Sequence, residues 1–115
     1  MSSAFAPVLD ALTRQRGVRA SLVVDAEEGI TIDANLQIGQ EGNRVAALAA
    51  SLYRKARKTA LTGGLGGTGF LQLESEDGRL CVIGGKDVVL VVLADRDANV
   101  GLIRVEMMRA AKVLG

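Results

Sequence analysis

The chain has 115 residues, with 14 Lys and Arg against 13 Asp and Glu, one cysteine, no histidine and 49% hydrophobic residues. This length predicts one domain over residues 1–115, while the missing histidine excludes imidazole-based catalysis and the single cysteine excludes an internal disulfide. A net charge of +1 and 3% aromatic residues argue against nucleic-acid binding, so the composition favours a binding protein without metal or cofactor.

The first half of the chain predicts a helix, two strands and a long second helix. Apolar residues between Phe5 and Leu12 recur with helical spacing, whereas those between Ala20 and Val24 alternate as in a strand. A second, antiparallel strand is expected from Ile30 to Ala34. A loop from Gly39 to Gly42 then leads into a long helix, predicted over Asn43 to Leu61.

The second half predicts three strands and a final helix. Strands are expected from Phe70 to Glu76 and from Arg79 to Ile83, joined by Asp77-Gly78, the strongest hairpin signal in the chain. The segment from Val88 to Ala94 is apolar on both faces, which predicts a central strand covered on both sides. A helix follows from Val100 to Leu114. The predicted fold is therefore α+β, in the order α-β-β-α-β-β-β-α, with helices on both faces of a five-stranded antiparallel sheet.

The long helix has more apolar residues than one sheet-facing stripe requires. The stripe expected to face the sheet consists of Val45, Leu48, Ala49, Leu52 and Ala56. Further apolar residues then fall on other faces, namely Ala46, Ala47, Ala50 and Tyr53. Alanine favours helices by itself. The alternative is a contact with a second helix across a dimer, or a platform for a partner.

The second half of the same helix is basic. Its cations are Arg54, Lys55, Arg57 and Lys58. Such a run usually marks a solvated helix face, and the sharper alternative is a docking patch for an acidic partner.

Gly64-x-Gly66-x-x-Gly69 matches the dinucleotide-binding pattern letter for letter. That pattern binds a pyrophosphate only between a strand and the helix that follows it. Here the helix comes first, so a flexible turn is the better interpretation. Cys81 is interpreted as a small buried hydrophobe. Four acidic residues near the first hairpin are interpreted as solvated, namely Asp25, Glu27, Glu28 and Asp33.

Asp95-x-Asp97-x-Asn99, with Glu106 further on, resembles a calcium-binding loop. The position that needs glycine for the sharp turn is Val100, and a strand precedes the loop where a helix is required. We therefore interpret the segment as a polar loop that caps the last helix.

In their order and spacing, five segments together resemble the Roadblock/dynein light chain family, especially its bacterial MglB-like branch. The resemblance covers nearly the whole chain. The matching segments are Leu22–Ala26 with Gly29-Ile30, Val45–Ala50, Leu71–Glu74, Val89–Ala94 and Asn99–Arg104.

The resemblance implies a Roadblock/profilin-like fold and a homodimer in which the second helices pair and the third strands meet edge to edge. It further implies that the paired helices bind a small Ras-like GTPase, whose GTP hydrolysis MglB-like members accelerate by reorganising the GTPase's own residues. The family motif carries no arginine finger. The expected dimer or partner interface consists of Ala46, Ala47, Ala50, Tyr53, Arg54, Arg57, Phe70, Gln72 and Glu74.

Two alternatives stay open: a scaffold subunit of a larger complex with no effect on GTP turnover, and a small-ligand sensor domain. An enzyme is not expected. The sequence has no run of about 18 apolar residues and no signal-peptide pattern at its start. With one thiol, these features predict a cytoplasmic protein that does not insert into membranes.

Overall fold

The computed structural model describes residues 4–37 and 41–114, which form three helices and five strands. The order of the elements is the predicted one, and their bounds lie close to those expected. The loop predicted from Gly39 to Gly42 falls mainly outside the described residues. The elements are α1 (Ala6–Thr13), β1 (Val18–Asp25), β2 (Thr31–Leu36), α2 (Gly42–Thr62), β3 (Phe70–Ser75), β4 (Gly78–Gly84), β5 (Val88–Ala94) and α3 (Val100–Leu114).

The five strands form one antiparallel sheet in the order β2-β1-β5-β4-β3. The doubly apolar strand β5 lies at the centre, as its sequence predicts, with Val89, Leu90, Val91 and Val92 fully buried. The β4–β5 and β3–β4 pairs are hairpins, and β2 and β3 are the two edges. The α+β class and the topology are therefore confirmed.

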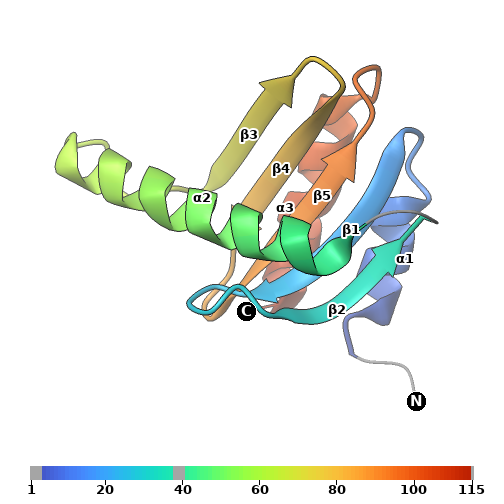
Figure 1. Cartoon of the computed structure of the whole chain (residues 1–115), viewed down its shortest axis with the longest axis horizontal. Coiled ribbons are helices and arrows are strands. Elements are labelled where there is room, and N and C mark those ends of the chain that lie inside the picture. Colours follow the sequence, from blue (N-terminus) through green and yellow to red (C-terminus); the bar gives the residue numbers. More distant parts are fainter. Residues whose placement is uncertain (1–3, 38–40, 115) are drawn as a thin grey trace.

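Two layers of helix enclose the sheet (Figure 1): α2 crosses one face, and α1 and α3 cover the other. Side chains alternate along each strand, so every inner strand contributes to both cores. On the α1 and α3 side, Leu9, Leu12, Ile103 and Met107 are buried against the sheet. Ala110 is buried beside them and Leu114 is partly buried, so Ile103, Met107, Ala110 and Leu114 form the inner face of α3.

None of the helices formed by residues 4–37 and 41–114 combines the length and the apolar character needed to cross a membrane.

Candidate interaction surface

Helix α2 packs on the sheet through small residues. The side chains that it buries there are Ala46, Ala49, Ala50 and Tyr53. Three alanines let the helix axis approach the valine- and leucine-rich strands closely, and the Tyr53 hydroxyl donates a hydrogen bond of 3.2 Å to the carbonyl of Thr68. The close contact leaves little room for longer side chains at the three alanine positions.

The sheet-facing stripe predicted for α2 is therefore correct only in part. Ala49 is buried and Val45 packs partly buried against the same core, as expected, but Leu48 is 64% exposed. Leu52 and Ala56 are only partly buried. The spacing of leucines and that of alanines both fit a helical period, and the narrow gap above the sheet selects the alanines.

The same finding corrects three of the expected interface residues. Ala46 and Ala50 are fully buried, and Tyr53 is nearly so, within the chain's own core. They support the surface from inside, and a partner has no access to them. Ala47 remains exposed on α2.

The two expected interface arginines differ in their surroundings. Arg54 donates a hydrogen bond of 2.8 Å from Nη1 to the carbonyl of Ala26, so it ties α2 to the β1–β2 turn. Arg57 is exposed three residues further on.

The outer edge of β3 pairs with no strand formed by residues 4–37 and 41–114. Phe70 is half-buried beneath Arg104, whose guanidinium carbon lies 5.1 Å from the ring centroid. Glu74 pairs with Arg79 at 2.9 Å. Gln72, between Phe70 and Glu74 on β3, is exposed. This edge therefore offers unpaired backbone groups beside polar side chains, the arrangement that pairs with another strand.

A groove of about 710 Å³ lies between α2 and the part of the sheet that the helix leaves uncovered. Leu73, on β3, is 47% exposed at its base. Glu76 and Asp77, from the β3–β4 turn, form part of its rim. The other apolar side chains that line it are Val45, Leu48, Leu52, Leu80 and Leu93. The sequence does not predict this groove, because Leu48 and Leu52, which are expected to be buried against the sheet, line it.

Helix α2 is longer than the sheet is wide. Its 21 residues span roughly 31 Å at 1.5 Å each, whereas five strands at about 4.8 Å spacing span about 19 Å between the outer two. Figure 1 shows the C-terminal turns of α2 extending past β3. The projecting part carries Arg57, Lys58 and Leu61, all exposed.

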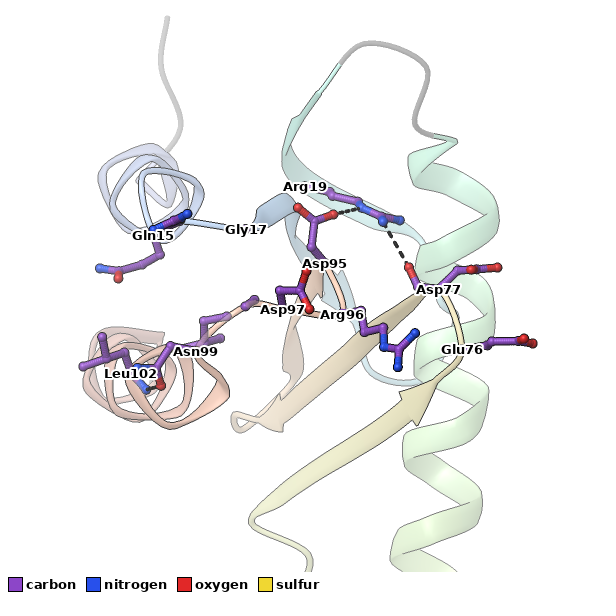
Figure 2. A pocket seen from close by; sticks show the side chains of 13 residues that line it. Gln15, Gly17, Arg19, Glu76, Asp77, Asp95, Arg96, Asp97, Asn99 and Leu102 are labelled. Carbon is purple, nitrogen blue, oxygen red and sulfur yellow. Dashed lines mark hydrogen bonds and ion pairs between the residues drawn. The ribbon is translucent and has the colours of Figure 1, made fainter.

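A second cleft, of about 860 Å³, lies where α1 ends and α3 begins (Figure 2). Arg19 spans it, pairing with Asp95 through Nε and donating a hydrogen bond of 3.0 Å from Nη2 to the carbonyl of Asp77. Arg96 and Asp97 also line it, so the cleft holds charges of both signs. Because these charges compensate one another, the cleft has no clear preference for an anion or a cation.

The segment that resembles a calcium-binding loop has a structural role. Asp95 pairs with Arg19, and the Asn99 side-chain oxygen accepts a hydrogen bond of 3.1 Å from the backbone N–H of Leu102. Glu106 lies on α3 and pairs with Arg109 at 3.1 Å. Within the described ranges, no group of three or more His, Cys, Asp or Glu side chains could hold a metal ion. The predicted helix cap is confirmed.

The remaining motifs also have structural roles. The glycine-rich segment joins the end of α2 to the start of β3, as the turn interpretation requires. Cys81 is fully buried, and this burial raises the pKa of its thiol although the nearby Arg79 guanidinium lowers it in part. The Asp25 carboxylate accepts hydrogen bonds of 3.0 and 2.8 Å from the backbone N–H groups of Glu27 and Glu28, which shapes the β1–β2 turn.

Comparison with known proteins gives concordant results. The model of the Roadblock/LC7 domain matches residues 5–94. Two uncharacterised proteins of Methanocaldococcus jannaschii are 36% and 33% identical, over 90% and 91% of this chain and 87% and 91% of theirs.

Solved structures agree in fold. A Roadblock/LC7 domain from Streptomyces avermitilis superposes with a TM-score of 0.87 at 23% identity, covering 97% of this chain and 95% of that one. The Myxococcus xanthus protein MglB superposes with a TM-score of 0.84 at 24% identity, covering 99% and 89%. The gliding protein MglB from Thermus thermophilus superposes with the same TM-score of 0.84, at 21% identity, covering 99% of this chain and 90% of that one.

Proposed function

Because the chain belongs to the Roadblock/LC7 domain family, we propose that it is a homodimeric, non-catalytic regulator or adaptor of a small Ras-like GTPase. The observation that carries this proposal is the form of α2, which extends past the edge of the sheet and exposes several cations along its length. The MglB structures, which share the fold of this chain, support the same proposed function.

The geometry of the chain favours a symmetric dimer about the β3 edge. A two-fold axis perpendicular to the sheet at this edge exchanges the two ends of β3 and sets the strand antiparallel to its copy. The same rotation carries the projecting end of α2 over the groove of the other copy. Leu61, which is 55% exposed, then has Leu73 and Leu80 of the second copy as apolar partners. The overhang and the groove thus complement each other.

The charges of these two surfaces are complementary at one end of the groove. The overhang carries Arg57 and Lys58, and the β3–β4 turn at the groove rim carries Glu76 and Asp77. Arg19, Lys55 and Arg79 line the rest of the groove. Opposite charges at the rim of an interface raise the association rate and fix the register more than they raise affinity. The acidic turn at the rim therefore supports the second copy of the chain as the occupant of the groove.

The dimer is tested by charge reversal at the overhang. Sedimentation velocity at micromolar concentration should give a dimer for the natural chain and a larger monomer fraction for Arg57→Glu combined with Lys58→Glu. Glu76→Lys combined with Asp77→Lys should have the same effect, and the four substitutions together should restore the dimer. Lys86→Glu, at an exposed position in the β4–β5 turn, is the matched control. A natural chain that stays monomeric overturns the proposal.

The outer face of α2 is the proposed GTPase platform. It combines Ala47 with Arg44 and Arg54, all of which are exposed and none of which lines the groove. An apolar side chain surrounded by cations suits a partner surface that is apolar at its centre and acidic at its rim. Pairing two α2 helices across the dimer doubles the area of this platform.

The platform is tested with a small Ras-like GTPase of the source genome, loaded with GDP or with a GTP analogue. We expect binding, with weaker binding for Ala47→Glu and for Arg44→Glu while both variants remain dimeric, because neither position lines the groove. Hydrolysis of GTP is then measured with and without the chain. Faster hydrolysis identifies a GTPase activator, and binding without acceleration identifies a scaffold. No binding in either nucleotide state contradicts the proposal.

A further inference from the structure

Helix α3 exposes apolar side chains on the side that faces away from the sheet. A helix that covers a sheet usually presents polar residues to solvent. Here Leu102, Val105 and Met108 follow one another at three-residue steps and are 55%, 51% and 47% exposed, and Val113 is 70% exposed. We call these four residues the α3 stripe. Their exposure is unexplained by the packing of the chain, because the buried side of α3 is already complete.

Cations lie beside and within the α3 stripe. Arg104 is held in place over the ring of Phe70, and Lys112 is exposed in the last turn of the helix. Arg109 is neutralised by Glu106 at 3.1 Å. Among residues 4–37 and 41–114, no carboxylate lies within ion-pair distance of Arg104 or Lys112. The surface around the stripe is therefore apolar with two uncompensated positive charges.

The α3 stripe lies on the opposite face of the sheet from α2 (Figure 1). The proposed dimer and GTPase surfaces both use α2 and the β3 edge. A ligand on the outer side of α3 therefore leaves α2 free, and it approaches the β3 edge only where Arg104 lies over Phe70.

We propose that the α3 stripe is a second docking surface, which binds an acidic amphipathic helical segment of another protein. The stripe extends from Leu102 to Val113, so the ligand needs about three helical turns. Apolar residues of that segment cover the stripe in the manner of a helix laid on an apolar surface. Its carboxylates meet Arg104 and Lys112, and the charges of the two partners then balance. This gives the chain the two separate faces that an adaptor needs.

A second copy of the chain fits the α3 stripe less well. An antiparallel pairing of two α3 helices centred on Met108 sets Arg104 of one copy against Lys112 of the other. Like charges placed opposite each other disfavour such a contact. An anionic membrane is also disfavoured, because lipid-binding segments carry clusters of about four to eight cations and only two are uncompensated here.

The probe is a fluorescent synthetic helix with leucines along one side and glutamates on both flanks. A matched peptide has lysines in place of the glutamates. We expect saturable binding of the glutamate peptide by fluorescence anisotropy, with binding of the lysine peptide at least about tenfold weaker. Amide chemical shifts should change along α3. Binding of both peptides with equal affinity would overturn the charge-based assignment.

Variants locate the site. Val105→Glu and Lys112→Glu should each weaken binding of the glutamate peptide by about tenfold or more. Both positions are exposed, and circular dichroism and thermal unfolding establish that the variants remain folded. Leu48→Glu, on the other face, should bind the peptide normally. Because no GTPase is present, this outcome is separate from that of the function proposed above.

Three further results would overturn the proposal. The first is the absence of peptide binding. The second is a chain that forms assemblies larger than a dimer which Val105→Glu disperses, because a second copy would then occupy the stripe. The third is co-sedimentation with vesicles of phosphatidylcholine and phosphatidylserine that Val105→Glu abolishes, because a membrane would then be the ligand.

Discussion

The phenol ring of Tyr53 lies directly over Gly84, so that a Cβ atom added at position 84 would stand only 1.9 Å from the tyrosine oxygen. This contact joins α2 to the end of β4. The ring is 8% exposed, and its hydroxyl is bonded to the carbonyl of Thr68. The tyrosine therefore has little freedom to move aside, and position 84 requires glycine for space.

Gly84→Ala should lower the free energy of unfolding by about 1–3 kcal/mol, the range expected when a methyl group is forced into a packed core. Urea denaturation measures the change. Gly67→Ala is the matched control, because no atom lies within 4 Å of the position of its added Cβ. An equal effect at both glycines would contradict the packing argument.

Alanine substitutions at Gly29 and Gly64 distinguish the cost of backbone strain from the cost of a steric clash. Both have positive φ angles, +70° and +75°, but only Gly29 has a close neighbour, the Cα of Ala47 at 3.1 Å from an added Cβ. Gly64→Ala should be destabilising by about 1–2 kcal/mol from strain alone. Gly29→Ala should be destabilising by more, because the β1–β2 turn and α2 would have to separate. Both are measured by urea denaturation at one protein concentration. Equal losses would mean that the turn moves away from α2 freely.

Asn99→Ala should be destabilising by about 1 kcal/mol, because its side-chain oxygen caps α3. Asp97→Ala is the comparison, since Asp97 is exposed in the same loop. Calcium chloride should leave the thermal midpoint of the natural chain unchanged. A midpoint that rises with calcium and loses this response in Asp97→Ala would re-establish the calcium-loop interpretation.

The buried Cys81 makes stability fall at alkaline pH. Burial raises the pKa of the thiol above its ordinary value of 9.0, with Arg79 opposing the shift. The folded chain therefore keeps its proton when the unfolded chain has lost it, and stability decreases as pH rises through 9.0. Cys81→Ala should show a smaller decrease between neutral and alkaline pH. The natural thiol should react with a thiol reagent only as fast as the chain unfolds.

The order of the elements follows from sequence because local signals agree with the packing. The alternation in β1, the Asp77-Gly78 turn and the doubly apolar β5 each indicate one structure. The faces of α2 do not follow in this way. Leucine and alanine rows share the helical period, and which row faces inward depends on how closely the sheet approaches. That distance is set by strands far away in the sequence.

The exposed side of α2 was predictable only in part. The sequence shows more apolar residues on α2 than one stripe requires, but it does not identify which of them are exposed. On α2, Leu48 and Leu61 are exposed, and alanines provide the close packing. Comparing the length of the helix with the width of the sheet is the signal that would have located the overhang.

Paired substitutions on α2 test this assignment of its faces. Leu48→Lys should change the free energy of unfolding by no more than about 0.5 kcal/mol, because the side chain is 64% exposed. Ala50→Leu should be destabilising by about 1–3 kcal/mol, because the added atoms have no space above the sheet. Both are measured by urea denaturation at a protein concentration low enough for the chain to be monomeric, since dimerisation would add to stability. If Leu48 faced the sheet instead, the lysine would be buried and the loss would be several kcal/mol, larger than that of Ala50→Leu.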